Sequence, residues 1–508
     1  MSKFTIKLVP LGISVAAESG AALGEILAPH GVELPCGGTS LCGGCRVRVL
    51  EGHLAVTDED RASLNASEID AGWRLACRAL VTEPICLQVE QWTLSPLGDD
   101  SRGRFSSSSN SSSSSSSSSS RDGIAVAVDL GTTTVVVQSF DLRTGELVGI
   151  RAALNPQAAC GSDVVSRIRF AMQSPDLTTL IRKAVGTMVE EVATGPAMEK
   201  RGPVREVLLV GNTVMHHLFC GLDVAPLSHV PFQSPALGTV EFSSGDLGWQ
   251  LPASCRIRFL HCVGGYVGSD LLAGVAACGM DRNSEITALV DLGTNAEIAL
   301  GNRDRILCAS TAAGPAFEGG EIRRGMRAST GAISSVTVVD GALHTSVIGA
   351  IAPRGLCGSG LVDAVAAGLE LGTILPSGRL RGGMDFFAIA GDIGLYQRDI
   401  RQLQLAKGAI ACGFELLLKR LGASPGQVKS VFLAGAFGNY VRAESAVRIG
   451  LLPGMAAGRL TPSGNTALRG AKLILSRPPD HEMPQLEHVA LASESGFENA
   501  FVSAMRLG

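Results

Sequence analysis

The chain has 508 residues, with 43 Lys and Arg against 47 Asp and Glu, so its formal net charge is −4. This balance gives no electrostatic reason to expect nucleic acid or an anionic membrane as a partner. We find no run of 18 or more apolar residues, because even the glycine-rich stretch 263–280 contains Asp270. A membrane span is therefore not expected. The length leaves room for about three domains.

The N-terminus begins with a predicted strand. Phe4, Ile6 and Leu8 alternate with Thr5 and Lys7, which is the period of a half-buried strand. A secretory signal is the alternative, since two lysines flank the start of an apolar stretch, but the alternation favours the strand. The 13 cysteines are odd in number and unevenly spread. This argues against a secreted disulfide framework and favours a reducing cytoplasm.

Residues 1–95 have the pattern of a small α+β module. Two strand-like stretches, 4–10 and 12–17, and an apolar helical stretch, 21–29, precede a cysteine-rich loop. Strand-like alternation returns after the loop, first in CRVRVLEG and then in WRLACRALVTEPICLQVE.

A serine-rich segment, 96–122, separates this module from the rest of the chain. From Arg104 to Asp122 it is almost pure serine, which is too polar to build a core. We predict a flexible tether with a random-coil span of about 25–30 Å. Such a tether lets the flanking parts move relative to each other. The alternative is a neutral low-complexity expansion whose length has no consequence.

From residue 123 onward, apolar strands alternate with helical stretches, which is typical of α/β layers. The segment 124–142 is answered by 286–302, and each contains an apolar strand, a DLGT turn and a second strand. Two such copies predict two similar lobes facing one another, each contributing one turn to a shared site. We divide them into lobe I, 123–285, and lobe II, 286–508.

Four cysteines in the N-terminal module have the spacing C-x5-C-x2-C-x31-C. Three thiolates on one glycine-rich loop and a distant fourth can surround a two-iron cluster, because the glycines let backbone amides turn toward the sulfurs. Zinc is the alternative, but it favours two short cysteine pairs. The predicted cluster ligands are Cys36, Cys42, Cys45 and Cys77. This module resembles [2Fe-2S] ferredoxins of the β-grasp fold. The remaining cysteines are expected to be core or near-core thiols.

The two DLGT turns are candidate phosphate sites. In the first, Asp129 ends the strand, and Gly131 lets the backbone approach a ligand beside threonine hydroxyls. Such a turn can hold phosphate oxygens, and the aspartate is placed for hydrated magnesium. The candidate residues are Asp129, Gly131, Thr132, Thr133 and Thr134 in the first turn and Asp291, Gly293, Thr294 and Asn295 in the second.

A third glycine motif follows directly after an apolar strand, in the segment VKSVFLAGAFGNYV. Small residues at this place would let a flat base lie against the backbone. The candidates are Gly435, Ala436, Phe437 and Gly438.

In this order, DLGTTT, DLGTN and LAGAFGN resemble the two phosphate motifs and the adenosine motif of the acetate and sugar kinase, chaperone and actin superfamily. The resemblance implies an actin-like ATPase domain that binds ATP, with Asp129 and Asp291 holding Mg through water. Further segments, among them NPQAACGSDVVSRI, VGNTVMHHLF and AAGPAFEGGEIRRGMRA, are similar to the ATP-dependent reductive activators of corrinoid proteins. That branch also carries an N-terminal [2Fe-2S] ferredoxin domain. Some of its members have a further domain after the ferredoxin domain, for which the serine tether leaves no room here.

Other residues are open to two interpretations. Lys407 resembles the superfamily's helix that touches the ribose, and a solvated lysine is the alternative. Glu318 is a candidate catalytic residue that aligns a water or a magnesium ligand, or else it pairs with neighbouring arginines. The stretch 355–360 either presents amides to an anion or makes a tight turn into a helix. His216 and His217 are expected to be a packed or surface pair, because adjacent helical residues diverge by about 100°.

The resemblance implies that the cluster delivers one electron to Co(II) of a corrinoid protein, giving Co(I), while ATP use drives the cycle. It implies a corrinoid protein of a methyltransferase system and a low-potential electron donor as partners. No nucleic acid or membrane is expected, and a homodimer stays open. The alternatives are a small-molecule kinase regulated by a ferredoxin sensor, and an ATP-switched electron-carrier or chaperone module.

Overall fold

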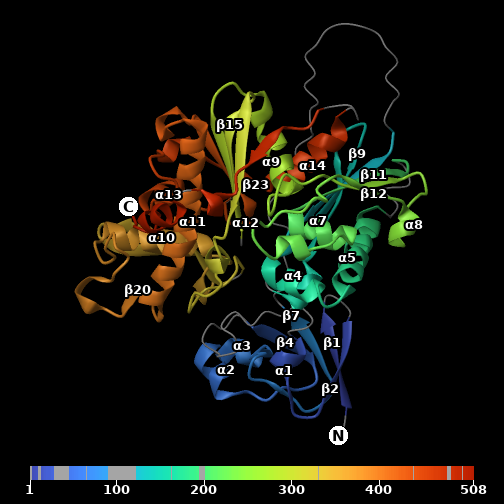
Figure 1. Cartoon of the computed structure of the whole chain (residues 1–508). Coiled ribbons are helices and arrows are strands. Elements are labelled where there is room, and N and C mark those ends of the chain that lie inside the picture. Colours follow the sequence, from blue (N-terminus) through green and yellow to red (C-terminus); the bar gives the residue numbers. More distant parts are fainter. Residues whose placement is uncertain are drawn as a thin grey trace.

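Three larger sheets, one in an N-terminal domain and one in each of two lobes, organise the chain (Figure 1). The computed structural model describes residues 3–9, 13–27, 45–64, 66–89, 122–161, 163–193, 201–293, 295–329, 331–438, 440–477, 482–494 and 496–508. The predicted serine tether, except for Asp122, and the cysteine loop up to residue 44 lie outside these residues.

The N-terminal domain has a five-stranded mixed sheet in the order β2-β1-β7-β4-β5. β1 runs antiparallel to β2 and parallel to β7. The expected alternation is confirmed, since Ile6 and Leu8 are fully buried in the core of this domain. Its strands are β1 (Lys3–Val9), β2 (Ile13–Glu18), β3 (Ala21–Ala22), β4 (Arg46–Glu51), β5 (Trp73–Leu75), β6 (Leu80–Val81) and β7 (Ile85–Val89), and its helices are α1 (Leu23–Leu27), α2 (Asp58–Ser63) and α3 (Ala66–Asp70).

Lobe I is built on a six-stranded sheet in the order β10-β9-β8-β11-β13-β12. β8 lies between antiparallel β9 and parallel β11. The strands are β8 (Ile124–Leu130), β9 (Thr134–Asp141), β10 (Leu147–Leu154), β11 (Val204–Val210), β12 (Val240–Phe242) and β13 (Arg256–Phe259). The helices packed around this sheet are α4 (Val164–Ala171), α5 (Asp176–Ala193), α7 (Thr213–Cys220) and α8 (Ser244–Leu247).

Lobe II repeats this arrangement. In its sheet, β23-β22-β14-β15-β16-β24, β14 lies between antiparallel β15 and parallel β22. β14 thus has the place of β8, which confirms the two similar lobes predicted from the repeated DLGT segment. The sheet strands are β14 (Thr287–Leu292), β15 (Ala296–Asn302), β16 (Arg305–Thr311), β22 (Ser430–Ala434), β23 (Leu460–Gly464) and β24 (Leu486–His488).

The remaining elements of lobe II surround this sheet. They are β17 (Ala332–Val339), β18 (Ala342–Val347), β19 (Gly355–Leu356), β20 (Phe386–Ala390), β21 (Ile393–Tyr396), α10 (Gly358–Glu370), α11 (Gln397–Leu421), α12 (Gly435–Gly438), α13 (Ala443–Arg448) and α15 (Phe497–Ala504). Short 3-10 helices of the two lobes are η3 (Pro156–Cys160), η4 (Ala225–Leu227), η5 (Met280–Arg282), η6 (Pro315–Glu318), η7 (Arg381–Gly383), η8 (Pro425–Gln427), η9 (Ala457–Arg459) and η10 (Leu491–Ser493).

Two helices cross between the lobes. α14 (Thr466–Ser476) belongs to the C-terminal segment, yet its residue Leu468 packs with Ala125 and Ala127 of the lobe I sheet. α9 (Ser269–Cys278) belongs to the preceding segment, yet it packs on the lobe II sheet. The helices touch so closely that a Cβ on Gly470 would lie 1.9 Å from the carbonyl oxygen of Ala273. Each of these helices therefore packs on the sheet of the other lobe, across the lobe boundary predicted between residues 285 and 286.

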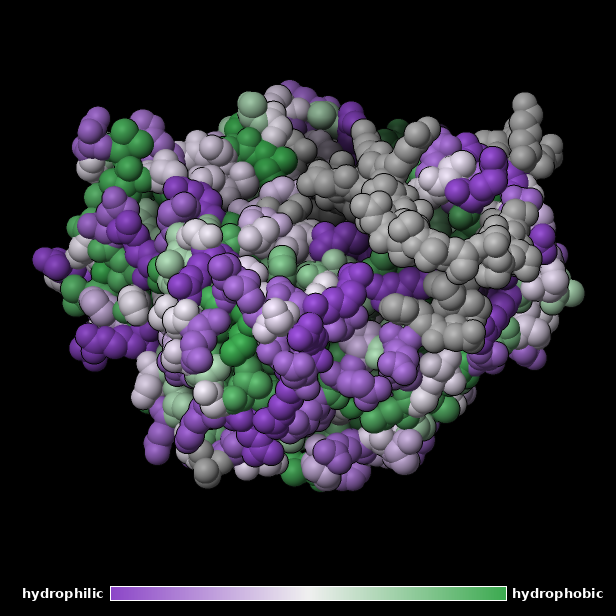
Figure 2. Space-filling model, turned by 90° about the horizontal axis from the view of Figure 1, so that it is seen from above, coloured by the Kyte–Doolittle hydropathy of each residue, from purple (hydrophilic) through white to green (hydrophobic). Residues whose placement is uncertain are grey.

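The N-terminal domain lies below both lobes in Figure 1. Leu154, at the end of β10, packs against its apolar core, and Arg354 of lobe II forms an ion pair with Glu68 of α3. On the opposite face, hydrophilic and hydrophobic residues are intermixed over both lobes (Figure 2). Among the described residues, no helix is both long enough and apolar enough to cross a bilayer.

Candidate nucleotide cleft and cluster site

The two aspartates of the DLGT turns lie at the ends of the central strands of the two lobes. Asp129 is the sixth residue of β8 and Asp291 the fifth of β14. Burial raises the pKa of Asp129 to about 6. Asn465 Nδ2 donates a hydrogen bond of 2.6 Å to Asp129 Oδ2, and this bond partly opposes the rise. Burial and the charge of Asp129 raise the pKa of Asp291 to about 7. The two carboxylates therefore face one region, where a cation would stabilise their charged forms.

Two further carboxyl groups join this region, and the sequence analysis did not identify either of them. Glu297 of β15 is paired directly across the strands with Asp291, and its side chain is 7% exposed. Burial, followed by the charges of Asp270 and Asp291, raises its pKa well above the usual value. Like charges directly opposite each other destabilise a sheet. Lobe I has Val136 at the equivalent position beside Asp129, so the cleft is chemically asymmetric.

Asp270 comes from the first turn of α9, the helix that crosses between the lobes. Burial raises its pKa to about 8; the Leu271 amide opposes this shift, and the charges of Asp291 and Asp129 add to it. In the sequence, Asp270 stands out only as a charge within an apolar stretch. The hairpin geometry could have identified Glu297, because residues directly paired across a hairpin have side chains on one face.

The first phosphate turn is held in place by Asn155, the residue that caps the N-terminus of η3. Gly131 N donates to the carbonyl of Thr134 over 3.0 Å, and a Cβ on Gly131 would lie 2.7 Å from that oxygen. Asn155 Nδ2 donates to the carbonyl of Gly131 over 2.9 Å, and Asn155 N donates to that of Thr133 over 2.8 Å. The turn therefore requires glycine, and η3 fixes its shape.

Two further contacts connect this turn to its surroundings. Asn212, which caps α7, donates from Nδ2 to Thr132 Oγ1 over 2.9 Å. Thr133 Oγ1 donates to Glu318 Oε2 over 3.2 Å, so the turn of lobe I touches η6 of lobe II. This brings the candidate catalytic residue Glu318 to the first phosphate turn.

The third glycine motif lies against the second phosphate turn. Gly435 has φ +83°, and a Cβ there would lie 2.6 Å from Asp291 Oδ1. Gly293 and Asn295 form the turn between β14 and β15, while Thr294 and the side chain of Ala436 lie outside the described residues. Gly435 is thus required by both backbone conformation and space.

Phe437 and Gly438 pack into lobe II. Phe437 is 7% exposed and stacks on Phe317, with ring centroids 4.7 Å apart. Gly438 lies beside Leu433, where a Cβ would be 3.0 Å from its carbonyl carbon. Phe437 therefore contributes core packing below the motif, and any surface for a base comes from the backbone around it.

The neighbouring stretch 355–360 makes a packed entry into α10. A Cβ on Gly358 would lie 1.8 Å from the carbonyl oxygen of Phe317, and one on Gly360 would lie 2.0 Å from that of Ile333. This close packing favours the tight turn over the anion site.

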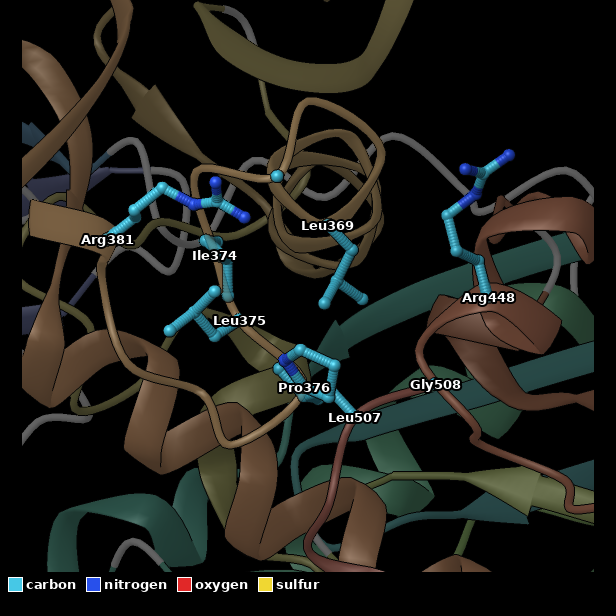
Figure 3. Close-up of a pocket in the computed structure, with 9 residues that line it drawn as sticks. Leu369, Ile374, Leu375, Pro376, Arg381, Arg448, Leu507 and Gly508 are labelled. Atoms are coloured by element: carbon cyan, nitrogen blue, oxygen red, sulfur yellow. The ribbon is translucent and has the colours of Figure 1, made fainter.

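Lys407 is a buried residue of α11 and is 2% exposed, so the interpretation as a solvated lysine is wrong. Its Nζ donates to the carbonyl of Arg506 over 2.6 Å, and burial lowers its pKa to about 8. The adjoining residues Leu507 and Gly508 line a cavity of about 310 Å³ between Arg381 and Arg448 (Figure 3). These contacts support a role in holding the C-terminal segment, and the predicted ribose contact stays a prediction.

The histidine pair is packed as expected. His217 Nε2 lies 2.8 Å from Ser234 Oγ, and His216 Nε2 lies 3.1 Å from the carbonyl oxygen of Gly238. Burial lowers the pKa of His216 to about 4. Both histidines are therefore core residues of lobe I.

Two of the predicted cluster ligands are described, and the fold brings them together. Cys45 directly precedes β4 and is 1% exposed, and Cys77 lies in the turn after β5 and packs against the same core. Ala76 N donates to the carbonyl of Cys45 over 2.9 Å, which ties the two ligand segments to each other. Cys36 and Cys42 fall within 28–44, outside the described residues. The two described thiols fit a thiolate-bound cluster.

Several other cysteines lie in the core, as expected: Cys86, Cys255, Cys262, Cys308, Cys357 and Cys412 are buried. Within the described ranges, no three His, Cys, Asp or Glu side chains are arranged to hold a metal ion directly.

Three family profiles match consecutive parts of the chain. The profile described as "2Fe-2S iron-sulfur cluster binding domain" matches residues 7–82, "RACo middle region" matches 124–283, and "C-terminal domain of RACo the ASKHA domain" matches 285–508. The profiles identify a [2Fe-2S] ferredoxin domain followed by an actin-like ATPase fold, which confirms the predicted fold class and cofactors.

Two curated relatives and one solved structure share most of this architecture. The corrinoid activation enzyme RamQ of Eubacterium limosum is 34% identical over 417 residues, covering 75% of this chain and 70% of the relative. The [Co(II) methylated amine-specific corrinoid protein] reductase of Methanosarcina barkeri is 26% identical over 422 residues, covering 74% and 76%. The structure of a reductive activator for corrinoid, iron-sulfur protein has a TM-score of 0.65 and 27% identity, covering 99% of this chain and 98% of that chain.

Proposed function

The chain belongs to the RACo family of reductive activators of corrinoid proteins, and we propose that it returns a corrinoid protein from Co(II) to Co(I) in an ATP-dependent cycle. The single observation that carries this proposal is the union, in one chain, of a ferredoxin-type thiolate site and a two-lobed cleft with paired DLGT aspartates. When bound, the cluster supplies one electron to the corrinoid cobalt, and Mg-ATP supplies the free energy of binding and hydrolysis.

Asp129 and Asp291 would hold Mg through water. Burial raises the pKa of Asp129 to about 6, and burial together with the charge of Asp129 raises the pKa of Asp291 to about 7. A nearby divalent cation favours the ionised forms and reverses these shifts. Binding of Mg-ATP therefore releases protons from this pair near neutral pH, and the pair becomes a site of two negative charges.

Asp270 and Glu297 are proposed to hold protons beside this pair. Glu297 lies directly across the strand pair from Asp291, and the pKa values of both Asp270 and Glu297 are raised by burial and by neighbouring charges. A carboxyl group that keeps or accepts a proton near neutral pH can assist a reacting water molecule. Glu318, bonded to Thr133 across the cleft, would orient the groups around the phosphates.

Nucleotide acts on the electron transfer only through protein states that it stabilises unequally. A bias of about 10⁴ corresponds to about 5.5 kcal/mol, or about 240 mV for one electron at about 59 mV per decade. The Thr133–Glu318 contact joins the two lobes at the phosphate turn, so phosphates bound there would alter how the lobes meet. Through this change in the contact between the lobes, nucleotide bound in the cleft would affect a bound corrinoid protein.

Several finer points belong to the same proposal. The chain would work in the cytoplasm, take electrons from a low-potential donor, and consist of domains 1–95, 123–285 and 286–508 joined by the serine tether 96–122. The low net charge gives no electrostatic reason to expect nucleic acid or an anionic membrane as a partner.

The test is anaerobic visible and EPR spectroscopy of a Co(II) corrinoid protein mixed with the reduced protein, with and without Mg-ATP. We expect the Co(II) signal to be lost and Co(I) to appear only with Mg-ATP. Asp291→Asn should lose the ATP effect while keeping the cluster spectrum. No change with several corrinoid proteins, with the cluster intact and reduced, would contradict the proposal and favour the redox-regulated kinase.

A further inference from the structure

The ferredoxin domain contacts both lobes of the ATPase domain, and each contact has a different chemistry. Glu68 accepts a hydrogen bond of 2.8 Å from Arg46 Nη1 within its own domain and also pairs with Arg354 of lobe II. The side chains of Glu68 and Arg354 are only 10% and 15% exposed. On the other side, Leu154 of lobe I packs against the apolar core of the ferredoxin domain. We call Leu154 and Arg354 together the two-lobe dock.

The lobe I half of the dock adjoins the first phosphate turn. Leu154 ends β10, and the next residue, Asn155, binds the carbonyl groups of Gly131 and Thr133. A shift of this turn toward bound phosphates would therefore be transmitted to Leu154 through one peptide unit.

The lobe II half adjoins the other side of the cleft. Arg354 N donates to the carbonyl of Gly331 over 2.8 Å, and Arg354 leads through β19 into α10. The first residue of α10, Gly358, packs on the backbone of Phe317, which directly precedes Glu318. Glu318 in turn accepts the hydrogen bond from Thr133 of lobe I. A change in how the lobes meet at Glu318 would thus act close to Arg354.

On the ferredoxin side, the dock contacts the end of the domain that carries the cluster ligands. Arg46, which shares Glu68 with Arg354, directly follows Cys45. Ala76, which binds the carbonyl of Cys45, directly precedes Cys77. The docked position therefore holds the ligand-bearing end of the ferredoxin domain near the ATPase lobes.

From this geometry we infer that the two-lobe dock is a nucleotide-linked latch for the chain's own ferredoxin domain. Docking needs Leu154 and Arg354 at one particular separation, and these residues belong to lobes that meet at the nucleotide cleft. Nucleotide binding therefore changes the docked population. Because the ferredoxin domain and the two lobes belong to one chain, docking is intramolecular, and linked modules have an effective concentration of about millimolar, so weak docking contacts suffice for a balanced equilibrium.

The coupling is reciprocal, because linkage requires docking to alter nucleotide affinity by the same factor by which nucleotide alters docking. Bound Mg-ATP thus controls when the cluster end is available to another protein. This inference rests on the proposed function only in requiring that nucleotide binds the cleft. The docking contact itself needs no corrinoid protein.

The test compares full-length holoprotein variants by small-angle X-ray scattering and by titration with Mg-ATP. In Arg354→Glu, two carboxylates replace the ion pair, and we expect a larger radius of gyration and a docked-to-undocked ratio lower by about tenfold or more. Leu154→Ala, in the other lobe, should also increase the radius of gyration and lower the docked-to-undocked ratio. Arg305→Glu is the matched control, because it reverses an exposed arginine of lobe II that pairs with Glu487 away from the dock.

In the wild type, Mg-ATP should change the radius of gyration, and in Arg354→Glu this response should be reduced. The dissociation constant of Mg-ATP should differ between wild type and Arg354→Glu and not between wild type and Arg305→Glu. An unchanged radius and an unchanged affinity in both dock variants would overturn the inference. A normal dock response in a protein that reduces no corrinoid protein would instead overturn the proposed function and leave the latch standing.

Discussion

Gly435→Ala is the substitution for which the structure gives the sharpest expectation. Gly435 has φ +83°, and the new Cβ would lie 2.6 Å from Asp291 Oδ1 and 2.7 Å from the carbonyl oxygen of Leu292. To reach tolerated contacts of at least 3.0 Å, Asp291 Oδ1 must move about 0.4 Å and the Leu292 carbonyl oxygen about 0.3 Å away from the new Cβ. The left-handed conformation adds a cost of about 1–2 kcal/mol for a residue with a Cβ.

A second glycine separates these two effects. Gly422, at the end of α11, has φ +72°, and a Cβ there would have no atom within 4 Å, so Gly422→Ala carries the backbone cost alone. Gly422→Ala should lose about 1–2 kcal/mol of stability, and Gly435→Ala should lose at least as much. Only Gly435→Ala should also bind Mg-ATP about tenfold more weakly or worse, because it displaces a carboxylate that positions the metal.

The assay is chemical denaturation together with calorimetric titration of Mg-ATP for both variants and the wild type. The wild type and Gly422→Ala should share one dissociation constant. If Gly435→Ala binds Mg-ATP as tightly as Gly422→Ala does, the third glycine motif does not border the nucleotide site, and the assignment of Asp291 to that site is refuted.

Three other predictions concern the buried carboxyl groups, a cluster ligand and Lys407. Without nucleotide, the contribution of Asp129, Asp291 and Asp270 to stability should fall as pH rises from about 4 to about 8, because the folded state retains protons on these carboxyl groups, whose pKa values are raised to about 6, about 7 and about 8, while the unfolded chain has released them. Thermal unfolding across this range checks the sign, and a slope that is no smaller in Asp291→Asn would exclude Asp291 as a contributor. Cys45→Ser should lose the cluster absorbance and cobalt reduction while keeping Mg-ATP affinity, and a fully retained cluster spectrum would remove Cys45 from the ligand set. Lys407→Met should lower stability by about 1–3 kcal/mol, since the buried bond to Arg506 is lost, and should leave Mg-ATP affinity unchanged; weaker Mg-ATP binding with unchanged stability would instead establish the ribose contact.

Local patterns in the sequence were sufficient for the architecture. The alternation of Phe4, Ile6 and Leu8 predicts β1 because a strand's side chains point to opposite faces in turn. The repeated DLGT segments predict two equivalent strand pairs, and the structure shows β8 and β14 with the same neighbours. The order of motifs in the two halves identified the family before any contact was known.

The cleft's additional groups required the tertiary structure. Asp270 lies on α9 and Asn465 directly before α14, and these helices reach the cleft only because α9 packs on the lobe II sheet and α14 on the lobe I sheet. The sequence leaves Lys407 open between a ribose contact and a solvated lysine, whereas its described bond is to Arg506, far along the chain. Short-range periodicity carries no information about such pairs.

The sequence by itself therefore determined the domain order, the thiolate spacing and the paired turns, because each depends on residues close together in the chain. Only the tertiary structure decided that Glu297 and Asp270 share the cleft with Asp129 and Asp291, and that Leu154 and Arg354 together hold the ferredoxin domain. These arrangements depend on how α9, α14 and the two sheets pack against one another. Burial and charge coupling arise from that packing, and no local sequence pattern encodes it.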